Sequence, residues 1–372
     1  MPQNTLFQRI ILPGLVMQSV LIGGGYATGR ELVEFFLSNG PLGGLLGLLT
    51  TMALISLISA IGFEFARLAR SYDYRSFFRA LLGRGWFLWE IAYFPTVLLV
   101  LAVLGAASGE LVATHFGIEA AWGITGLMLL IGILVFWGTG VIERVLAGWS
   151  FLLYATYGVL IVLYLARFGD ALGPNLSADT LDGNWLHGSL AYLGYNVAAV
   201  PVILFCVRHM ESRRDAFTAG MLAGPLAMIP ALLFFLGMAA SYPDIVAAPV
   251  PSDFMIQALD LGWMEIAFYL VVFGTFVETG TALIHAINER LSQAWSERGR
   301  TLPRWLRPVV AAIALIIAIV LAGRFGLIDL VARGYGTLTW LFIAIFVVPI
   351  LTIGVWRVGL FRSRPESVVE VC

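Results

Sequence analysis

Long apolar runs constrain this chain more than any other feature of its sequence. A helix needs roughly 17 to 25 largely apolar residues to cross the hydrocarbon core of a bilayer. Hydrophobic residues make up 60% of the sequence and charged residues only 12%, whereas a soluble domain carries about a quarter charged residues. The sequence therefore predicts an all-α polytopic membrane protein. We expect ten transmembrane helices, at about 10–37, 43–66, 86–114, 121–138, 145–166, 186–207, 217–240, 263–289, 306–323 and 335–356.

Arginine is distributed unevenly between the two sides that ten helices would define. Eighteen of the 22 basic residues, all of them arginine, fall at the two ends of the chain and on every second connection; Arg167, Arg324 and Arg333 fall on the other side. Short arginine-rich loops stay in the cytoplasm, so we expect both termini to be cytoplasmic. The connections are too short for a soluble domain. Residues 1–372 are therefore expected to form a single membrane domain.

The two halves of the chain share a pattern. In opposite orientations, the first and sixth runs each carry a Gly-Tyr interruption, and Tyr26 and Tyr195 are 169 residues apart. The third and eighth runs each carry a lone carboxylate, Glu110 and Glu278, 168 residues apart. Inverted repeats with broken helices in matching positions are typical of secondary transporters, whose site lies between the repeats. We therefore expect repeat one at about 10–166 and repeat two at about 186–356.

The interruptions are the candidate substrate site. An unwound backbone inside a membrane is tolerated only beside protein or a water-filled cavity, and free peptide dipoles at a helix break attract ions. Close helix packing through Gly25 and Gly29 is the structural alternative, because small residues four apart often serve that purpose. The candidate substrate-binding residues are Gly23, Gly24, Gly25, Tyr26, Ala27, Thr28, Gly194, Tyr195 and Asn196.

The stretch GGGYATGREL, the ten runs and the GYN of the sixth run resemble the YkvI-like bacterial membrane proteins. That group is similar in turn to the amino acid–polyamine–organocation superfamily. The resemblance implies a LeuT-like 5+5 inverted repeat with helices 1 and 6 broken, in the bacterial cytoplasmic (inner) membrane. It does not identify a substrate.

Arg30 is the candidate gate residue. Arg30 and Glu34 are four residues apart and can pair along one helix face, so a self-neutralised structural cluster with Glu31 is one interpretation. The other is that Arg30 closes the outer vestibule by pairing with Asp329 or Glu110. In LeuT-like proteins an outer gate of this kind joins the first and tenth helices.

Glu278 is the candidate coupling acid. It falls near the centre of the eighth run, where charged residues usually face a pathway or a partner, and it could carry a proton. Thr279 and Thr281 could instead bind Na⁺, as hydroxyls of the eighth helix do in the proteins that this chain resembles. A purely structural Glu278 is the third possibility, and the sequence does not decide among them.

These features predict an ion-coupled secondary transporter of a small organic solute, an amino acid or an amine, that works by alternating access. The alternative is a non-transporting receptor or assembly partner with a transporter-like fold. An enzyme is not expected, because the chain has no GxSxG and no HExxH motif. We expect no metal centre, no cofactor other than Na⁺ or H⁺ as the coupling ion, and no nucleic acid partner. The bilayer and a small-molecule substrate are the expected partners, and the oligomeric state is left open.

Overall fold

The computed structural model describes residues 5–137, 142–178, 181, 184–296 and 299–362, and all regular elements among them are helices. The prediction of an all-α membrane protein is confirmed, because six stretches are long and apolar enough to cross a membrane. They are Pro41–Leu68, Tyr74–Phe116, Phe151–Ala178, Arg213–Ala239, Gly262–Ser296 and Leu306–Gly359; Phe7–Leu21 and Ala120–Phe136 are shorter apolar helices.

The helices follow the predicted runs closely. In the first half they are η1 (Phe7–Ile11), α1 (Leu12–Leu21), α2 (Gly24–Thr28), α3 (Arg30–Phe35), α4 (Pro41–Leu68), α5 (Tyr74–Leu82), α6 (Phe87–Phe116), α7 (Ala120–Trp137), α8 (Ile142–Phe168) and α9 (Leu172–Ala178). In the second half they are α10 (Trp185–Asn196), α11 (Ala199–Val202), η5 (Leu204–His209), α12 (Arg213–Ala239), α13 (Pro251–Leu259), α14 (Gly262–Ser296), α15 (Leu306–Asp329), η7 (Leu330–Tyr335), α16 (Gly336–Phe342) and α17 (Val355–Arg362).

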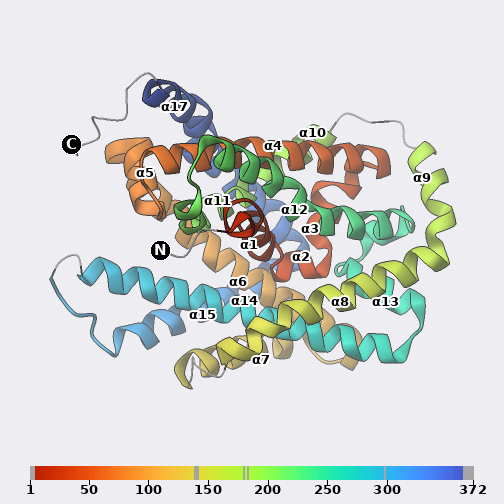
Figure 1. Cartoon of the computed structure of the whole chain (residues 1–372). Coiled ribbons are helices and arrows are strands. Elements are labelled where there is room, and N and C mark those ends of the chain that lie inside the picture. Colours follow the sequence, from red (N-terminus) through yellow and green to blue (C-terminus); the bar gives the residue numbers. More distant parts are fainter. Residues whose placement is uncertain (1–4, 138–141, 179–180, 182–183, 297–298, 363–372) are drawn as a thin grey trace.

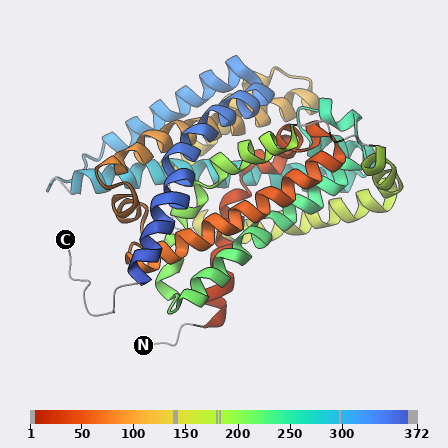
Figure 2. The same ribbon diagram turned by 90° about the horizontal axis from the view of Figure 1, so that it is seen from above.

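Two groups of packed helices make up the molecule. In the first, α4 packs along α12, with α1 against α12 and α10 against α4; in the second, α6 packs on α7 and α15, and α14 on α7 and α8. Figure 2 shows α4 (orange-red) and α12 (green) running side by side. Glycine makes this contact possible, because a Cβ on Gly220 would overlap the backbone of Ala60. Inside a bilayer the hydrophobic effect does not drive helices together, and small residues strengthen their association because they let the backbones approach closely.

The arginine-rich segments gather at one end of the molecule. In Figure 1, α5 and α17 lie at the left end, and α9 and α13 lie at the right end. Helix α5 carries Arg75 and Arg79, whereas α13 carries Asp253 and no arginine. We call the left end the arginine-rich end; Arg298 and Arg364, which we also assign to it from the sequence, lie outside the described residues.

The last membrane segment begins earlier than the sequence predicts. Helix α15 bends at Gly326, whose φ of 69° and ψ of 173° are not helical, and the chain is helical again from the next residue. Positive φ is a conformation that glycine adopts at little cost. Asp329 therefore lies inside a helix rather than in a connection before residue 335.

Candidate functional site

The first membrane segment is interrupted as the three glycines predict. Helix α1 ends at Leu21, Ile22 has φ −80° and ψ 75°, and Gly23 is extended at φ −101° and ψ −171°. Helix α2 then begins at Gly24. A second interruption, which the sequence analysis did not predict, follows at Gly29, where φ is 78°. The segment is thus three short helices in series, with backbone groups freed at both joints.

Neighbouring side chains bind the carbonyl groups that end α2. The hydroxyl of Tyr157, on α8, donates to the Ala27 carbonyl, and the hydroxyl of Ser252, on α13, donates to the Thr28 carbonyl at 3.0 Å. The N–H of Arg30 donates to the Thr28 hydroxyl at 3.2 Å. These bonds meet the requirement that backbone polar groups at membrane depth find partners.

The sixth segment is also interrupted, but by a tight turn at Val197 and Ala198 and not by extended residues. Helix α10 ends at Asn196, but Val197 and Ala198 keep helical angles and the chain continues through α11 and the 3₁₀ helix η5. The Asn196 amide donates to the Tyr192 carbonyl of its own helix at 3.0 Å. Gly194 packs on Thr339, where a Cβ would lie 2.5 Å from the threonine methyl. Gly194 serves close packing here, and Asn196 uses its amide locally.

Helix α14 lies beside the first interruption. A Cβ on Gly23 would lie 3.7 Å from the methyl carbon of Thr279, which is ordinary contact. The Thr281 hydroxyl instead donates to carbonyls of its own helix, Val277 at 2.8 Å and Glu278 at 2.9 Å. Glu278 is half-buried. Of the two threonines, Thr279 is the one whose side chain approaches Gly23, and it does so through its methyl group.

A cavity of about 160 Å³ opens on the same interruption from the side of α8 and α12. Tyr26 lies in its wall, and the Tyr26 hydroxyl is buried without a hydrogen-bond partner among the described residues. Small-molecule sites are mostly apolar with a few polar groups, but they are usually about 300–1,000 Å³ in volume, so this cavity would have to enlarge to hold more than a small solute. The principal lining residues are Ile22, Tyr26, Ala27, Tyr154, Tyr157 and Phe234.

Glu31 joins the first and sixth segments, and we did not single it out from the sequence as a functional residue. The Tyr195 hydroxyl donates to Glu31 Oε2 at 2.6 Å, and Glu31 is only 5% exposed. Tyr335 stacks on Tyr195, with ring centroids 4.4 Å apart. Among the described residues, Glu31 makes no ion pair. A buried carboxylate with one hydrogen-bond donor is energetically expensive, which makes it a candidate for binding a proton or a cation.

Arg30 does pair with Glu34, at 2.7 Å, as the i, i+4 spacing predicts. Its other amino group donates to the carbonyls of Val246 at 3.0 Å and Ala248 at 3.2 Å. The predicted partners Asp329 and Glu110 are wrong for this structure. Asp329 lies near Arg333 at 3.4 Å, and both of these side chains are largely exposed. Arg30 therefore holds the connection between α12 and α13 over α3, the last helix of the first segment.

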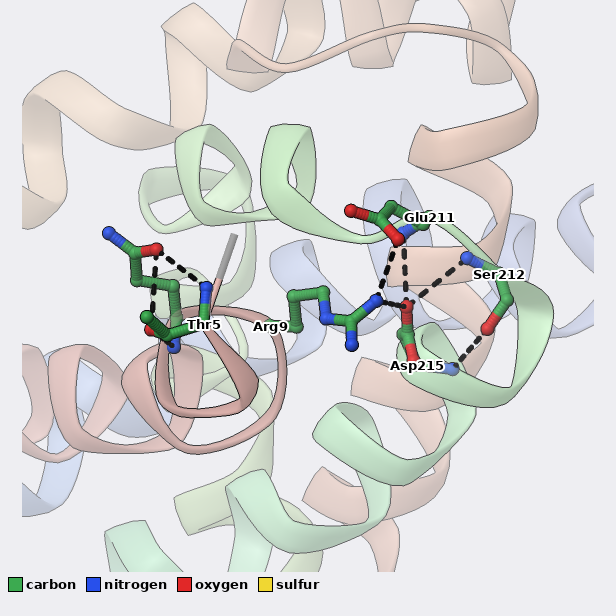
Figure 3. Close-up of polar contacts among 6 residues, drawn as sticks. Thr5, Arg9, Glu211, Ser212 and Asp215 are labelled. Atoms are coloured by element: carbon green, nitrogen blue, oxygen red, sulfur yellow. Dashed lines mark hydrogen bonds and ion pairs between the residues drawn. The ribbon is translucent and has the colours of Figure 1, made fainter. Parts of the chain in front are cut away.

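An ion pair fixes the opposite end of the first segment (Figure 3), as the Arg30 hydrogen bonds fix its α3 end; we call these two sets of contacts ties. Arg9, on η1, binds Glu211 at 2.8 Å and reaches Asp215 at 3.5 Å. Asp215 also accepts N–H bonds from Glu211 and Ser212, and Ser212 caps α12. The arginine-rich end of the first segment is thus fixed to the beginning of α12.

A third polar cluster lies where α6, α13 and α14 meet. Asp253 accepts from Tyr269 at 2.6 Å, lies 2.9 Å from His115, and accepts from Gln257 at 2.8 Å. The sequence gives no sign of this cluster, because Asp253 and Tyr269 are more than 130 positions away from His115 along the chain.

No family model matches the chain. It is 21% identical over 266 residues to the membrane protein YkvI of Bacillus subtilis (strain 168), a match that covers 70% of this chain and 74% of YkvI. Crystal structures of two mutants of the manganese transporter of Eremococcus coleocola superpose with TM-scores of 0.52 and 0.51, at 15% identity, over 95% of this chain and 88% of theirs.

These comparisons first place the fold: the chain has a fold similar to that of a solved membrane transporter. YkvI is a membrane protein, and the solved structures are those of a membrane transporter. More particularly, the similarity to YkvI confirms the resemblance drawn from the sequence.

Proposed function

We propose that this protein is an ion-coupled secondary transporter of a small organic solute, an amino acid or an amine, that works by alternating access. The observation that carries the proposal is the non-helical pair Ile22–Gly23, which lies beside Thr279 and borders a cavity. Backbone at membrane depth is left non-helical only where protein or a wet cavity surrounds it. Gly23, Gly24, Gly25, Tyr26, Ala27 and Thr28, with Gly194, Tyr195 and Asn196, remain the proposed substrate-binding residues.

Pairwise packing supports ten spans arranged as a 5+5 inverted repeat. Helices α4 and α12, the predicted second and seventh spans, occupy matching positions in the two repeats and pack along each other. Glu110 and Glu278 fall on α6 and α14, the matching third and eighth spans. The gathering of arginines at one end supports cytoplasmic termini in a bacterial inner membrane.

The coupling ion is proposed to bind beside the first interruption. Sodium would use Thr279 with carbonyl groups near Gly23, because hard cations take oxygen ligands. A proton would use a carboxylate, and the geometry favours Glu31 over Glu278: Glu31 is the more deeply buried and connects α3 to α10. No other cofactor is needed for this function.

An organic cargo suits the first interruption better than a metal. The segment Leu21–Thr28 reads LIGGGYAT and offers no carboxylate, imidazole or thioether, whereas divalent transition metals select such ligands. The described residues also contain no group of three or more His, Cys, Asp or Glu arranged for a metal ion. We therefore do not propose manganese, which the structural relatives transport, as the substrate of this protein.

A ligand screen tests the proposal. Purified protein is heated with amino acids, amines and carboxylates while sodium and pH are varied independently, and any stabilising solute is then tested for uptake into proteoliposomes. We expect at least one solute to raise the midpoint of thermal unfolding. An ion gradient across the proteoliposome membrane should then drive its accumulation. Saturable stabilisation without uptake would favour the receptor alternative instead.

A further inference from the structure

We propose that a pocket at the arginine-rich end binds the phosphate group of an anionic phospholipid. The pocket lies between the end of α14 and the start of α15 and has a volume of about 360 Å³. Its polar lining is basic or hydroxylic, and this composition is the donor set that a phosphate diester requires. The lining residues are Ser292, Ser296, Arg300, Thr301, Arg304 and Arg307, with Leu302.

The pocket carries an excess of positive charge. Arg307 donates to the Ser292 hydroxyl at 3.2 Å and lies 3.7 Å from Glu289, with both charged side chains about half exposed. Within the described residues, Arg300 and Arg304 make no ion pair. Among the described residues, three arginines line the pocket, and Glu289, which pairs with Arg307, is the carboxylate next to them. Planar guanidinium groups bind phosphate oxygens in pairs, which gives both strength and orientation.

The hydroxyl groups add to the same wall. Ser292 and Ser296 are four residues apart, so they lie one above the other on a single face of α14. Thr301 follows in the connection to α15. Hydroxyl donors between guanidinium groups complete the coordination of an anion without adding negative charge.

The depth of the pocket favours a lipid phosphate over a soluble one. Helix α14 has 35 residues, which at about 1.5 Å per residue exceeds the roughly 30 Å hydrocarbon core. Its last turns therefore extend beyond that core. Trp305, beside the pocket, is 64% exposed, and exposed tryptophan is typical of the level of the lipid headgroups. Basic pockets at this level bind acidic headgroups.

Lipid retention by the purified protein tests the site, independently of any transport activity. The full chain is mixed with phosphatidylglycerol, phosphatidylcholine or inorganic phosphate and examined by native mass spectrometry. The test variant is Arg300→Gln with Arg304→Gln. The matched control is Arg324→Gln with Arg333→Gln, which removes two exposed arginines from outside the pocket.

We expect phosphatidylglycerol to be retained by the parent and control proteins, and to be bound about tenfold or more weakly by the test variant. Arg300→Lys with Arg304→Lys should restore part of the binding, because charge returns without the planar fork. Equal retention of phosphatidylglycerol by the test variant, or equal retention of phosphatidylcholine by the parent, would overturn the proposal. Inorganic phosphate competing as well as the lipid at equal concentration would overturn the lipid assignment.

Discussion

At the scale of single residues, Glu31 links α3, the last helix of the first segment, to α10 of the sixth segment through a hydrogen bond. Its carboxylate has one hydrogen bond, from Tyr195, and no ion pair among the described residues. A movement that separates α3 from α10 would therefore remove its polar partner. Because the charged form is expensive in an interior of low dielectric, such a movement and a change in protonation would be coupled.

Glu31→Gln tests this coupling. Glutamine keeps the volume of the side chain and can still accept the Tyr195 hydroxyl bond, so we expect the variant to fold. Solute-dependent stabilisation should lose its pH dependence in Glu31→Gln and keep it in Glu278→Gln. The reverse result would assign the proton to Glu278. If both variants keep the pH dependence, neither acid carries the proton.

Tyr195→Phe removes the donor and leaves the carboxylate buried alone. Hydrogen bonds to charged groups contribute about 1.5–3 kcal/mol, so we expect a lower thermal midpoint than that of the parent. In the double variant with Glu31→Gln, the added loss should be smaller, because no buried charge remains to be orphaned. If the loss in the double variant equals the sum of the losses in the two single variants, the two groups do not interact energetically.

At the scale of helices, the two joints in the first segment impose different demands on glycine. Gly29 has a φ of 78°, and a Cβ there would lie 3.1 Å from Phe234 and 3.2 Å from the sulfur of Met238. Gly23 has a negative φ, and the nearest atom to its Cβ position is 3.7 Å away. Only the first of these positions requires glycine for its conformation.

Alanine substitutions should separate the joints. A left-handed conformation costs a residue with a Cβ about 1–2 kcal/mol, so Gly29→Ala should lower the thermal midpoint measured by heating in detergent. Gly23→Ala should leave the midpoint near that of the parent. Equal midpoints for the two variants would mean that α2 and α3 are not joined as described.

The sequence predicts the joint at Gly23, but it does not predict that the break in the sixth segment is only a tight turn after Asn196. Three consecutive glycines have a direct conformational meaning, whereas GYN followed by Pro201 is compatible with a continuous helical path, because Pro201 lies near the start of α11. The partners of Arg30 show another limit. Glu34 follows from helical spacing, but the Val246 and Ala248 carbonyls are backbone acceptors more than 210 positions away. Backbone carbonyls in connections carry no sequence signal.

At the scale of the whole molecule, the first segment is tied at both ends to the region of α12. Arg9 binds the residues that begin α12, and Arg30 binds the connection that follows it. Alternating access requires that these ties open in turn. The tie at Arg9 was not predicted, because a lone arginine near the amino terminus is explained equally well by the topology rule.

One measurement tests the central claim, that the joint at Gly23 borders a cavity that is reached from alternate sides of the membrane. Cys206 and Cys372 are replaced by serine, and Ala27→Cys, which places a thiol in the cavity wall, is labelled in oriented vesicles with a membrane-impermeant reagent. We expect slow labelling in this background. Arg9→Gln should give faster labelling from the arginine-rich side, and Arg30→Gln faster labelling from the opposite side. Failure of the thiol to react from either side in all three proteins would contradict the account.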